Sequence, residues 1–99
     1  MIVYNTTFHI EKDILDESLV YLKIQYIPKA VESGCLQRPC LRRVLQAEEG
    51  EDISLSVQFH VKNIDTLNFW LQNEGNNLHR ALVARFGHKI PALVLYWKR

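Results

Sequence analysis

Two histidines occur in nearly identical tripeptides, FHI at Phe8–Ile10 and FHV at Phe59–Val61. Both tripeptides end a stretch in which apolar and polar residues alternate, a pattern typical of a β-strand. Successive side chains of a strand point to opposite faces of its sheet, so the phenylalanines are expected to face a core and the histidines to face away from it. Two imidazoles on one face can bind an anion, a metal ion or an acidic ligand.

The same alternation assigns six polar residues to the face of the two histidines, and we call them the polar strip. They are Asn5, Thr7, His9, Ser56, Gln58 and His60. If the protein binds a small-molecule ligand, we expect this strip to hold it, because the hydroxyl and amide groups can add hydrogen bonds to those of the imidazoles. No third metal ligand and no carboxylate that would orient a histidine is apparent, which favours a polar face covered by water or by a partner chain.

Four predicted strands and two predicted helices position these residues. The strands are expected over 1–10, from Cys40 to Glu49, over 53–61 and over 90–97, and the helices from Asp13 to Gly34 and from Asn63 or Asp65 to Gly87. Asp13 is expected to cap the first helix, and Pro28 to kink or break it. Gly75 is expected to weaken the second helix without interrupting its apolar stripe. The acidic run EEGED, Glu48–Asp52, predicts a solvated hairpin turn.

The resulting order, β-α-β-β-α-β, predicts one ferredoxin-like α+β domain over residues 1–99. We expect a four-stranded antiparallel sheet with both helices on one face. The strands of residues 1–10 and 53–61 are expected to be neighbours at its centre and to run parallel, as right-handed crossovers would place them. Parallel strands would bring His9 and His60 together at one end of the sheet.

The last predicted strand is apolar on both of its faces, with Ala92, Val94 and Tyr96 on one side and Leu93, Leu95 and Trp97 on the other. The helices can cover only one face of the sheet, so a strand of this kind needs a second cover. A second copy of the chain is the simplest cover, because most soluble oligomers are symmetric homo-oligomers. We therefore predict a homodimer that forms through the open sheet face.

Charge and aromatic placement argue against a nucleic-acid or membrane partner. Twelve basic and eleven acidic residues give a net charge of +1, which provides no broad field to attract a polyanion. RNA-recognition domains share this element order but stack bases on aromatic residues of the open face. Here Tyr4, Phe8 and Phe59 are expected on the helix-facing side. No apolar run is long enough to span a membrane.

The N-terminal stretch lacks the pattern of an export signal, so we expect a cytoplasmic protein in which Cys35 and Cys40 are reduced. Two cysteines without a nearby histidine pair are too few for a closed zinc site. The sequence contains no nucleophile elbow, P-loop, dinucleotide fingerprint or HExxH motif, and we predict neither a cofactor nor a catalytic residue. His79 and His88 are expected on the surface. A non-catalytic homodimeric binding or structural module is the function that this pattern favours.

Four blocks of the sequence, MIVYNTTFHI, YIPKAVESG, VQFHVKNIDTLNFW and RFGHK, resemble a small family of uncharacterised proteins. The family is found chiefly in Bacteroidetes and is described as a domain of unknown function. The resemblance covers nearly the whole chain and implies a cytoplasmic bacterial protein with a ferredoxin-like fold. The family has no assigned activity, so it implies no catalytic residues.

The chain is more distantly similar to dimeric α/β-barrel proteins, which include antibiotic-biosynthesis monooxygenases and haem-degrading enzymes. This likeness implies an alternative function, a small cofactor-independent monooxygenase or a haem-binding enzyme. The haem-degrading members use an Asn, a Trp and a His, for which Asn5, Trp70 and His79 would stand. Trp70, however, is expected on the buried stripe of the second helix, which departs from that arrangement.

Overall fold

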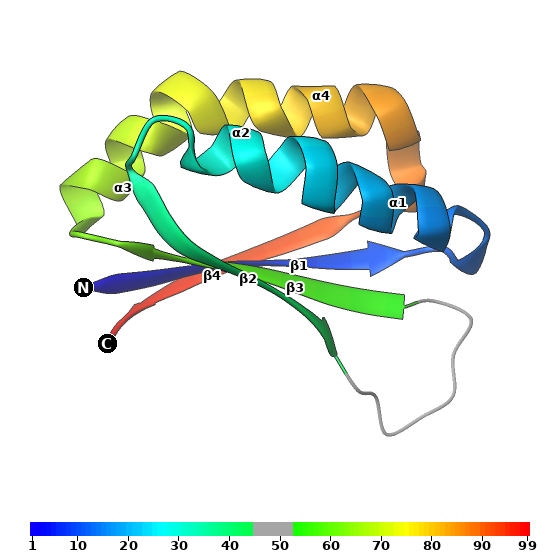
Figure 1. The fold of residues 1–99 in the computed structure, drawn as a ribbon, viewed down its shortest axis with the longest axis horizontal. Coiled ribbons are helices and arrows are strands. Elements are labelled where there is room, and N and C mark those ends of the chain that lie inside the picture. The colour runs from blue at the N-terminus through cyan, green and yellow to red at the C-terminus, as the bar shows by residue number, and fades with distance from the viewer. Residues whose placement is uncertain (45–52) are drawn as a thin grey trace.

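Two helical rods cover one face of a twisted four-stranded sheet and leave the other face open (Figure 1). The structure, a computed structural model, describes residues 1–44 and 53–99. The strands are β1 (Ile2–Ile10), β2 (Leu36–Val44), β3 (Ile53–Val61) and β4 (Ala92–Lys98). The first rod consists of the 3-10 turn η1 (Lys12–Ile14), α1 (Leu15–Tyr21), the π-helical turn η2 (Leu22–Tyr26) and α2 (Ile27–Val31). The second rod consists of α3 (Ile64–Trp70), the π-helical turn η3 (Leu71–Gly75), α4 (Asn76–Phe86) and the 3-10 turn η4 (Gly87–Lys89).

The sheet has the strand order β2-β3-β1-β4, and every neighbouring pair is antiparallel. This confirms the predicted ferredoxin-like α+β fold. The expected parallel pairing of the central strands is wrong, because β1 and β3 are antiparallel from Ile2↔Val61 to Ile10↔Ile53. The crossover through the first rod returns β2 to the direction of β1, and β3 then runs back between them. The strand that lies beside β1 is therefore the reversed one.

The first rod passes Pro28 without a break. This proline lies in the first turn of α2, directly after the π-helical turn η2. A proline has no N–H to donate, and its ring needs space near the preceding turn of the helix. A wider π-helical turn supplies that space, so it takes the place of the kink or break that the sequence predicts.

Asp13 does not cap the first helix, which corrects the sequence prediction. It lies inside η1, and neither η1 nor α1 has a side-chain cap. Its carboxylate accepts a 2.7 Å hydrogen bond from Lys89 Nζ, which holds the pKa of Asp13 below its usual value and raises the pKa of Lys89. The aspartate therefore links the start of the first rod to η4 at the end of the second.

Asn63 caps the second rod, as the sequence predicts. Its Oδ1 accepts hydrogen bonds of 2.8 Å from both the backbone N–H and the hydroxyl of Thr66. The rod runs on through Gly75, which confirms one continuous element. A Cβ at Gly75 would lie 2.9 Å from Cζ3 of Trp70, so this glycine gives the indole room to pack beside its own helix.

β2 includes Pro39, which the sequence prediction left outside the strand. Gln37 is opposite His60 and Cys40 is opposite Gln58, so two residues of β2 lie opposite one residue of β3. This is a β-bulge on an edge strand, where a proline costs no ladder hydrogen bond. The expected turn at Glu48–Asp52 lies outside the described residues.

The core lies between the helices and the sheet and is rich in aromatic rings. Phe8 and Phe59, from the repeated tripeptides, are 1% and 0% exposed. Phe8 meets Tyr26 edge to face, and Tyr4 lies within 6.5 Å of the ring centroids of both Phe59 and Trp70. The predicted placement of these strand aromatics on the helix-facing side is confirmed.

Candidate functional site

The polar strip lies on the open face of the two central strands, but its two histidines are far apart. The antiparallel register places Asn5 opposite Gln58, Thr7 opposite Ser56, His9 opposite Ser54 and His60 opposite Val3. A strand rises by about 3.3 Å per residue, so roughly 20 Å separate the two histidine positions along the sheet. The expectation that His9 and His60 are neighbours is therefore wrong, and its error follows from the assumed strand direction.

Side chains of the polar strip hydrogen-bond to one another and to Ser54. Ser56 Oγ donates to Asn5 Oδ1, and Asn5 Nδ2 donates to Thr7 Oγ1 at 3.0 Å. Ser54 Oγ and His9 Nδ1 share a hydrogen bond of 2.9 Å. A ligand that bonded to these groups would replace bonds that already exist and would gain little. The expectation that the strip holds a ligand stays a prediction.

Apolar residues flank the polar strip on both edges of the open face. On β4, Leu93, Leu95 and Trp97 are 54%, 52% and 44% exposed. On β2, Val44 is 40% exposed and lies opposite Ser54. Every residue of β4 is exposed, including those on its helix-facing side. A single chain therefore leaves β4 uncovered on both faces.

A cavity of about 250 Å³ lies on the other side of the sheet, between the sheet and the helical rods. We call it the helix-side cavity. It is lined by Tyr4, Thr6, Phe8, Tyr26, Trp70, Leu71, Gly75, Asn76, His79, Ala92 and Val94. The described lining contains no aspartate, glutamate, lysine or arginine. Four of its residues are aromatic but almost fully buried, so the open surface belongs mainly to the others, and its titratable groups are two phenols and the imidazole of His79.

Two residues of this lining carry a buried polar atom without a hydrogen-bond partner, Thr6 Oγ1 and Trp70 Nε1. The two residues are 3% and 1% exposed. Leaving a buried donor unpaired costs about 1–3 kcal/mol, and native interiors contain few such atoms. Neither atom has accessible surface, so both lie behind the cavity wall and not on its surface.

Tyr4 and Tyr26 add two hydroxyl groups near Thr6 in the same wall. Burial raises the pKa of both phenols, and more strongly that of Tyr26, while the nearby Thr6 hydroxyl offsets part of the rise. Both phenols lie close enough to the Thr6 hydroxyl to interact with it, although neither contact has the geometry of a well-formed hydrogen bond. Both tyrosines are therefore neutral at physiological pH.

The sequence prediction did not select Thr6 or Tyr26 as site residues, although a signal for Thr6 was present. Thr6 interrupts the apolar face of its strand between Tyr4 and Phe8, where a buried hydroxyl needs a partner. The sequence pattern assigns Tyr26 to the apolar stripe of the first helix and gives no further signal for it. Only the packing of helix against sheet shows that these residues border a common cavity.

The helix-side cavity collects two of the three residues of the haem-degrading pattern. Trp70 and His79 both line it, and Trp70 is buried as the helical stripe predicts. Asn5 instead lies on the open face, where it is bonded to Ser56. Consecutive residues of a strand face opposite ways, so Thr6 rather than Asn5 lies at the cavity. The expected grouping of Asn5 with Trp70 and His79 is wrong.

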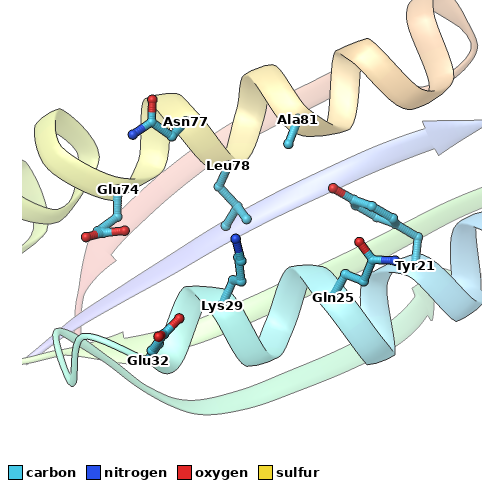
Figure 2. Close-up of a pocket in the computed structure, with 8 residues that line it drawn as sticks. All are labelled: Tyr21, Gln25, Lys29, Glu32, Glu74, Asn77, Leu78 and Ala81. Atoms are coloured by element: carbon cyan, nitrogen blue, oxygen red, sulfur yellow. The ribbon is translucent and has the colours of Figure 1, made fainter.

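A second depression, of about 270 Å³, lies between the two helical rods (Figure 2). Figure 2 shows Gln25, Lys29 and Glu32 on the first rod and Glu74 and Asn77 on the second, around this depression. These five side chains are exposed, so water can satisfy them without a ligand. We therefore assign this depression no function.

Within residues 1–44 and 53–99, no group of three or more His, Cys, Asp or Glu side chains is placed to hold a metal ion. No helix of the described part of the chain is both long enough and apolar enough to cross a membrane. Cys35 and Cys40 are free, half-buried thiols.

Comparisons with known proteins agree on the fold. The family model "Domain of unknown function (DUF4286)" matches residues 1–94. No curated protein matches the chain. An ethyl tert-butyl ether d (EthD) family protein from Bacillus halodurans is similar in structure, with a TM-score of 0.75, 11% identity, and coverage of 100% of this chain and 99% of that one.

HapK from Hahella chejuensis has a TM-score of 0.73 and 9% identity, over 100% of this chain and 92% of its own. The de novo designed protein Foldit4 has a TM-score of 0.60 and 7% identity, over 99% of this chain and 97% of its own. Identities this low indicate a shared fold, and a shared fold does not specify a shared function.

Proposed function

The chain belongs to the DUF4286 family, and we propose that it is a non-catalytic, homodimeric binding module in which two copies pack through the open faces of their sheets. The observation that carries this proposal is the composition of that face. Exposed Leu93, Leu95 and Trp97 lie beside a polar strip in which Asn5, Thr7 and Ser56 already bond to one another.

Both features of the open face favour burial. Removing apolar surface from water is worth about 25 cal/mol per Å², and contiguous exposed apolar surface often marks an interaction site. The side chains of Asn5, Thr7 and Ser56 each already have a hydrogen-bond partner, which lowers the cost of taking them into an interface. The face therefore combines a driving force for association with a small cost of desolvation.

A second copy of the chain suits this face better than a charged partner. Within its described strands, the open face carries one charged side chain, Arg42, and no lysine, aspartate or glutamate. Scarcity of charge is typical of the centre of an interface. A two-fold axis would place the same apolar margin and polar centre of each copy against those of the other.

Sedimentation velocity at micromolar concentration tests the dimer. We expect twice the mass of one chain for the wild type and a monomer for Leu95→Asp, which puts a charge into the interface. Ile24→Asp is the matched control, because Ile24 is 66% exposed on the first rod, and this variant should remain a dimer. A monomeric wild type, or a dimeric and folded Leu95→Asp variant, would contradict the proposal.

A second candidate function is a haem-binding enzyme or a small cofactor-independent oxygenase, and the shared cavity of Trp70 and His79 favours it. We place it second because Asn5 faces away and because 250 Å³ is below the roughly 300–1,000 Å³ of typical ligand pockets. A Soret shift on haem titration that disappears in His79→Ala would support haem binding. The absence of any shift would exclude it.

A further inference from the structure

We propose that the free edge of β4 is a second self-association surface, at which two copies of the chain pair their β4 strands antiparallel and continue the sheet from one copy into the other. This inference goes beyond the open-face dimer, because it uses the backbone edge of the sheet instead of its face. A second copy is the occupant that the edge favours, since the strand is complementary to itself.

The backbone of β4 is bonded to β1 on one side and free on the other, because β4 is the last strand of the sheet. His9 N–H donates to the carbonyl of Pro91 at 2.9 Å, and Arg99 N–H donates to the carbonyl of Met1 at 3.0 Å. Hydrogen-bonded pairs alternate along an antiparallel ladder, so the odd-numbered residues of β4 bond to β1. The N–H and C=O groups that point outward belong to the even-numbered residues, Ala92, Val94, Tyr96 and Lys98.

The two edge strands of the sheet differ in how they are protected. β2 carries a proline, a β-bulge and three arginines, which are Arg38, Arg42 and Arg43. Prolines, bulges and charged side chains are the features that keep edge strands from pairing with other chains. From Ala92 to Trp97, β4 has none of these, and its register with β1 is unbroken. The edge of β4 is therefore open to pairing.

The helical rods leave room for a neighbouring strand at this edge. All residues of β4 are exposed. Val94 and Tyr96 lie on the helix-facing side, opposite Thr6 and Tyr4 of β1, and are still 48% and 55% exposed. A helix above the edge would bury both side chains, so the described helices do not stand over the place that an added strand would take.

A two-fold axis perpendicular to the sheet at Leu95, the central residue of β4, gives the fullest backbone pairing. Val94 then lies opposite Tyr96 of the partner copy, and Ala92 lies opposite Lys98 of the partner copy. Such pairs exchange both of their hydrogen bonds in an antiparallel ladder. Every outward backbone group from Ala92 to Lys98 thus gains a partner, whereas a register shifted by one or two residues leaves some of these groups unpaired.

The side chains also match in this register. On the helix-facing side, the ring of Tyr96 lies across from the β-branched Val94 of the partner copy. On the open face, Leu93 lies across from Trp97 of the partner copy. Aromatic and apolar cross-strand pairs of this kind stabilise antiparallel sheets, and like charges directly opposite each other destabilise them. Lys98 is the one charged residue of β4, and it meets an alanine.

The size of the contact determines its strength. A single pair of seven-residue strands covers less than the roughly 1,200–2,000 Å² that stable interfaces bury. We therefore expect the edge contact to form at about 0.1–1 mM, above the micromolar range proposed for the open-face dimer. A dimer that has formed through the open faces offers two β4 edges, so association at high concentration proceeds beyond two chains.

Sedimentation equilibrium over a range of about 10 μM to 1 mM tests whether this association occurs. We expect the average mass of the wild type at the highest concentration to be at least about twice its value at the lowest, because each edge contact joins two particles.

Residue-specific hydrogen exchange, measured by NMR at the two ends of this range, tests where the association occurs. The outward N–H groups of Val94, Tyr96 and Lys98 should exchange at least about tenfold more slowly at the high concentration. The N–H groups of the odd-numbered residues between them already bond to β1, so their exchange should not change with concentration. Packing through the open face alone would not produce this alternation.

Two substitutions of Val94 form a matched pair. Val94→Pro removes an outward N–H but no hydrogen bond to β1, and proline is tolerated on edge strands in this position. It should abolish the rise in mass, whereas Val94→Thr keeps the N–H and the β-branched shape and should retain it. If the proline lowers the melting temperature, Tyr96→Lys is the second variant. It keeps the backbone intact, adds a charge to the edge and should weaken the association at least about tenfold.

A wild-type mass that stays constant over the range would overturn the proposal. A rise in mass without slower exchange of the outward N–H groups, or an equal rise in folded Val94→Pro and Val94→Thr, would also overturn it. The open-face dimer is judged separately at micromolar concentration. A chain that is monomeric there and gains edge protection at high concentration supports the edge contact alone, and a dimer whose mass does not rise refutes the edge contact alone.

Discussion

The two faces of the sheet use polar residues in opposite ways, and Thr6 and Thr7 show the difference most clearly. Thr7 lies on the polar open face, where its hydroxyl accepts a hydrogen bond from Asn5. Thr6 lies on the apolar, helix-covered face, where its hydroxyl is buried near the phenols of Tyr4 and Tyr26 and makes no well-formed hydrogen bond. On the open face, polar side chains bond to one another. On the helix-covered face, which is otherwise apolar, the buried polar atoms of Thr6 and Trp70 make no well-formed hydrogen bond.

This difference bears on how a binding site is recognised. A row of polar side chains attracts notice in a sequence, but its members can neutralise one another across neighbouring strands. A buried threonine and a buried tryptophan look ordinary in a sequence, yet they retain their hydrogen-bonding capacity when packing gives them no acceptor.

The largest expected effect separates the two faces within one tripeptide. Phe59→Ala should lower the free energy of unfolding by about 3–5 kcal/mol, because the ring is 0% exposed and its loss opens the core. His60→Ala, at the adjacent open-face position, should cost less than about 1 kcal/mol. Urea unfolding at a fixed protein concentration measures both. Equal costs would show that the open face is as tightly packed as the core.

Gly75→Ala should give a smaller effect on the helix-covered face, a net loss of up to about 2 kcal/mol. The added methyl group gains about 1 kcal/mol of helix propensity but meets the buried ring of Trp70, and overpacking costs about 1–3 kcal/mol. Thermal unfolding measures the sign.

Asn68→Ala, at an exposed position of α3, is the control for Gly75→Ala, and it should be slightly stabilising. In a Trp70→Phe background the loss at Gly75 should shrink, because the smaller ring leaves room. A stabilising Gly75→Ala in the wild type would show that the indole is not held against η3.

The smallest expected effect at neutral pH concerns the phenol of Tyr26, because its contribution to stability changes only above about pH 10. Burial raises the pKa of Tyr26 in the folded chain above its value of about 10 in the unfolded chain. The contribution of the neutral Tyr26 phenol to the free energy of unfolding is therefore fully present below about pH 10. It is lost as the pH rises toward the pKa of Tyr26 in the folded chain, at up to about 1.4 kcal/mol per pH unit. Tyr26→Phe should make this decline shallower in urea unfolding between about pH 10 and 12.

Tyr96→Phe is the control for Tyr26→Phe, because the Tyr96 ring is 55% exposed on β4. This control should leave the decline with pH as steep as in the wild type. A decline equally steep in Tyr26→Phe would show that its phenol is hydrated in the folded chain.

Much of the fold follows from local rules that act within a few residues. Alternation places Phe8 and Phe59 in the core and their neighbouring histidines on the open face, and Asn63 caps the second rod. Pro28 and Pro39 were harder to predict, because a π-helical turn and a β-bulge accommodate them. Both the π-helical turn and the β-bulge depend on the space that neighbouring helices and strands leave.

The candidate site was less predictable than the fold. Alternation fixes the face on which His9 and His60 lie, since it depends on strand geometry alone, but not the direction of the two strands. Direction depends on the path of the whole chain, and the antiparallel arrangement moves the histidines to opposite ends. For the same reason Asn5 could be assigned to a face but not to a site with Trp70 and His79.

The sequence by itself determined the element order, the two faces of each central strand and the apolar character of β4 on both sides. These features follow from backbone periodicity and from the side chains of single residues. The tertiary structure alone decided which polar groups are paired. Hydrogen bonding requires donor and acceptor to meet at about 3 Å, and residues distant in the sequence reach that separation only when strands pair and helices pack. Register thus made Asn5, Thr7 and Ser56 a bonded group, and packing buried Thr6 Oγ1 and Trp70 Nε1 without a well-formed hydrogen bond.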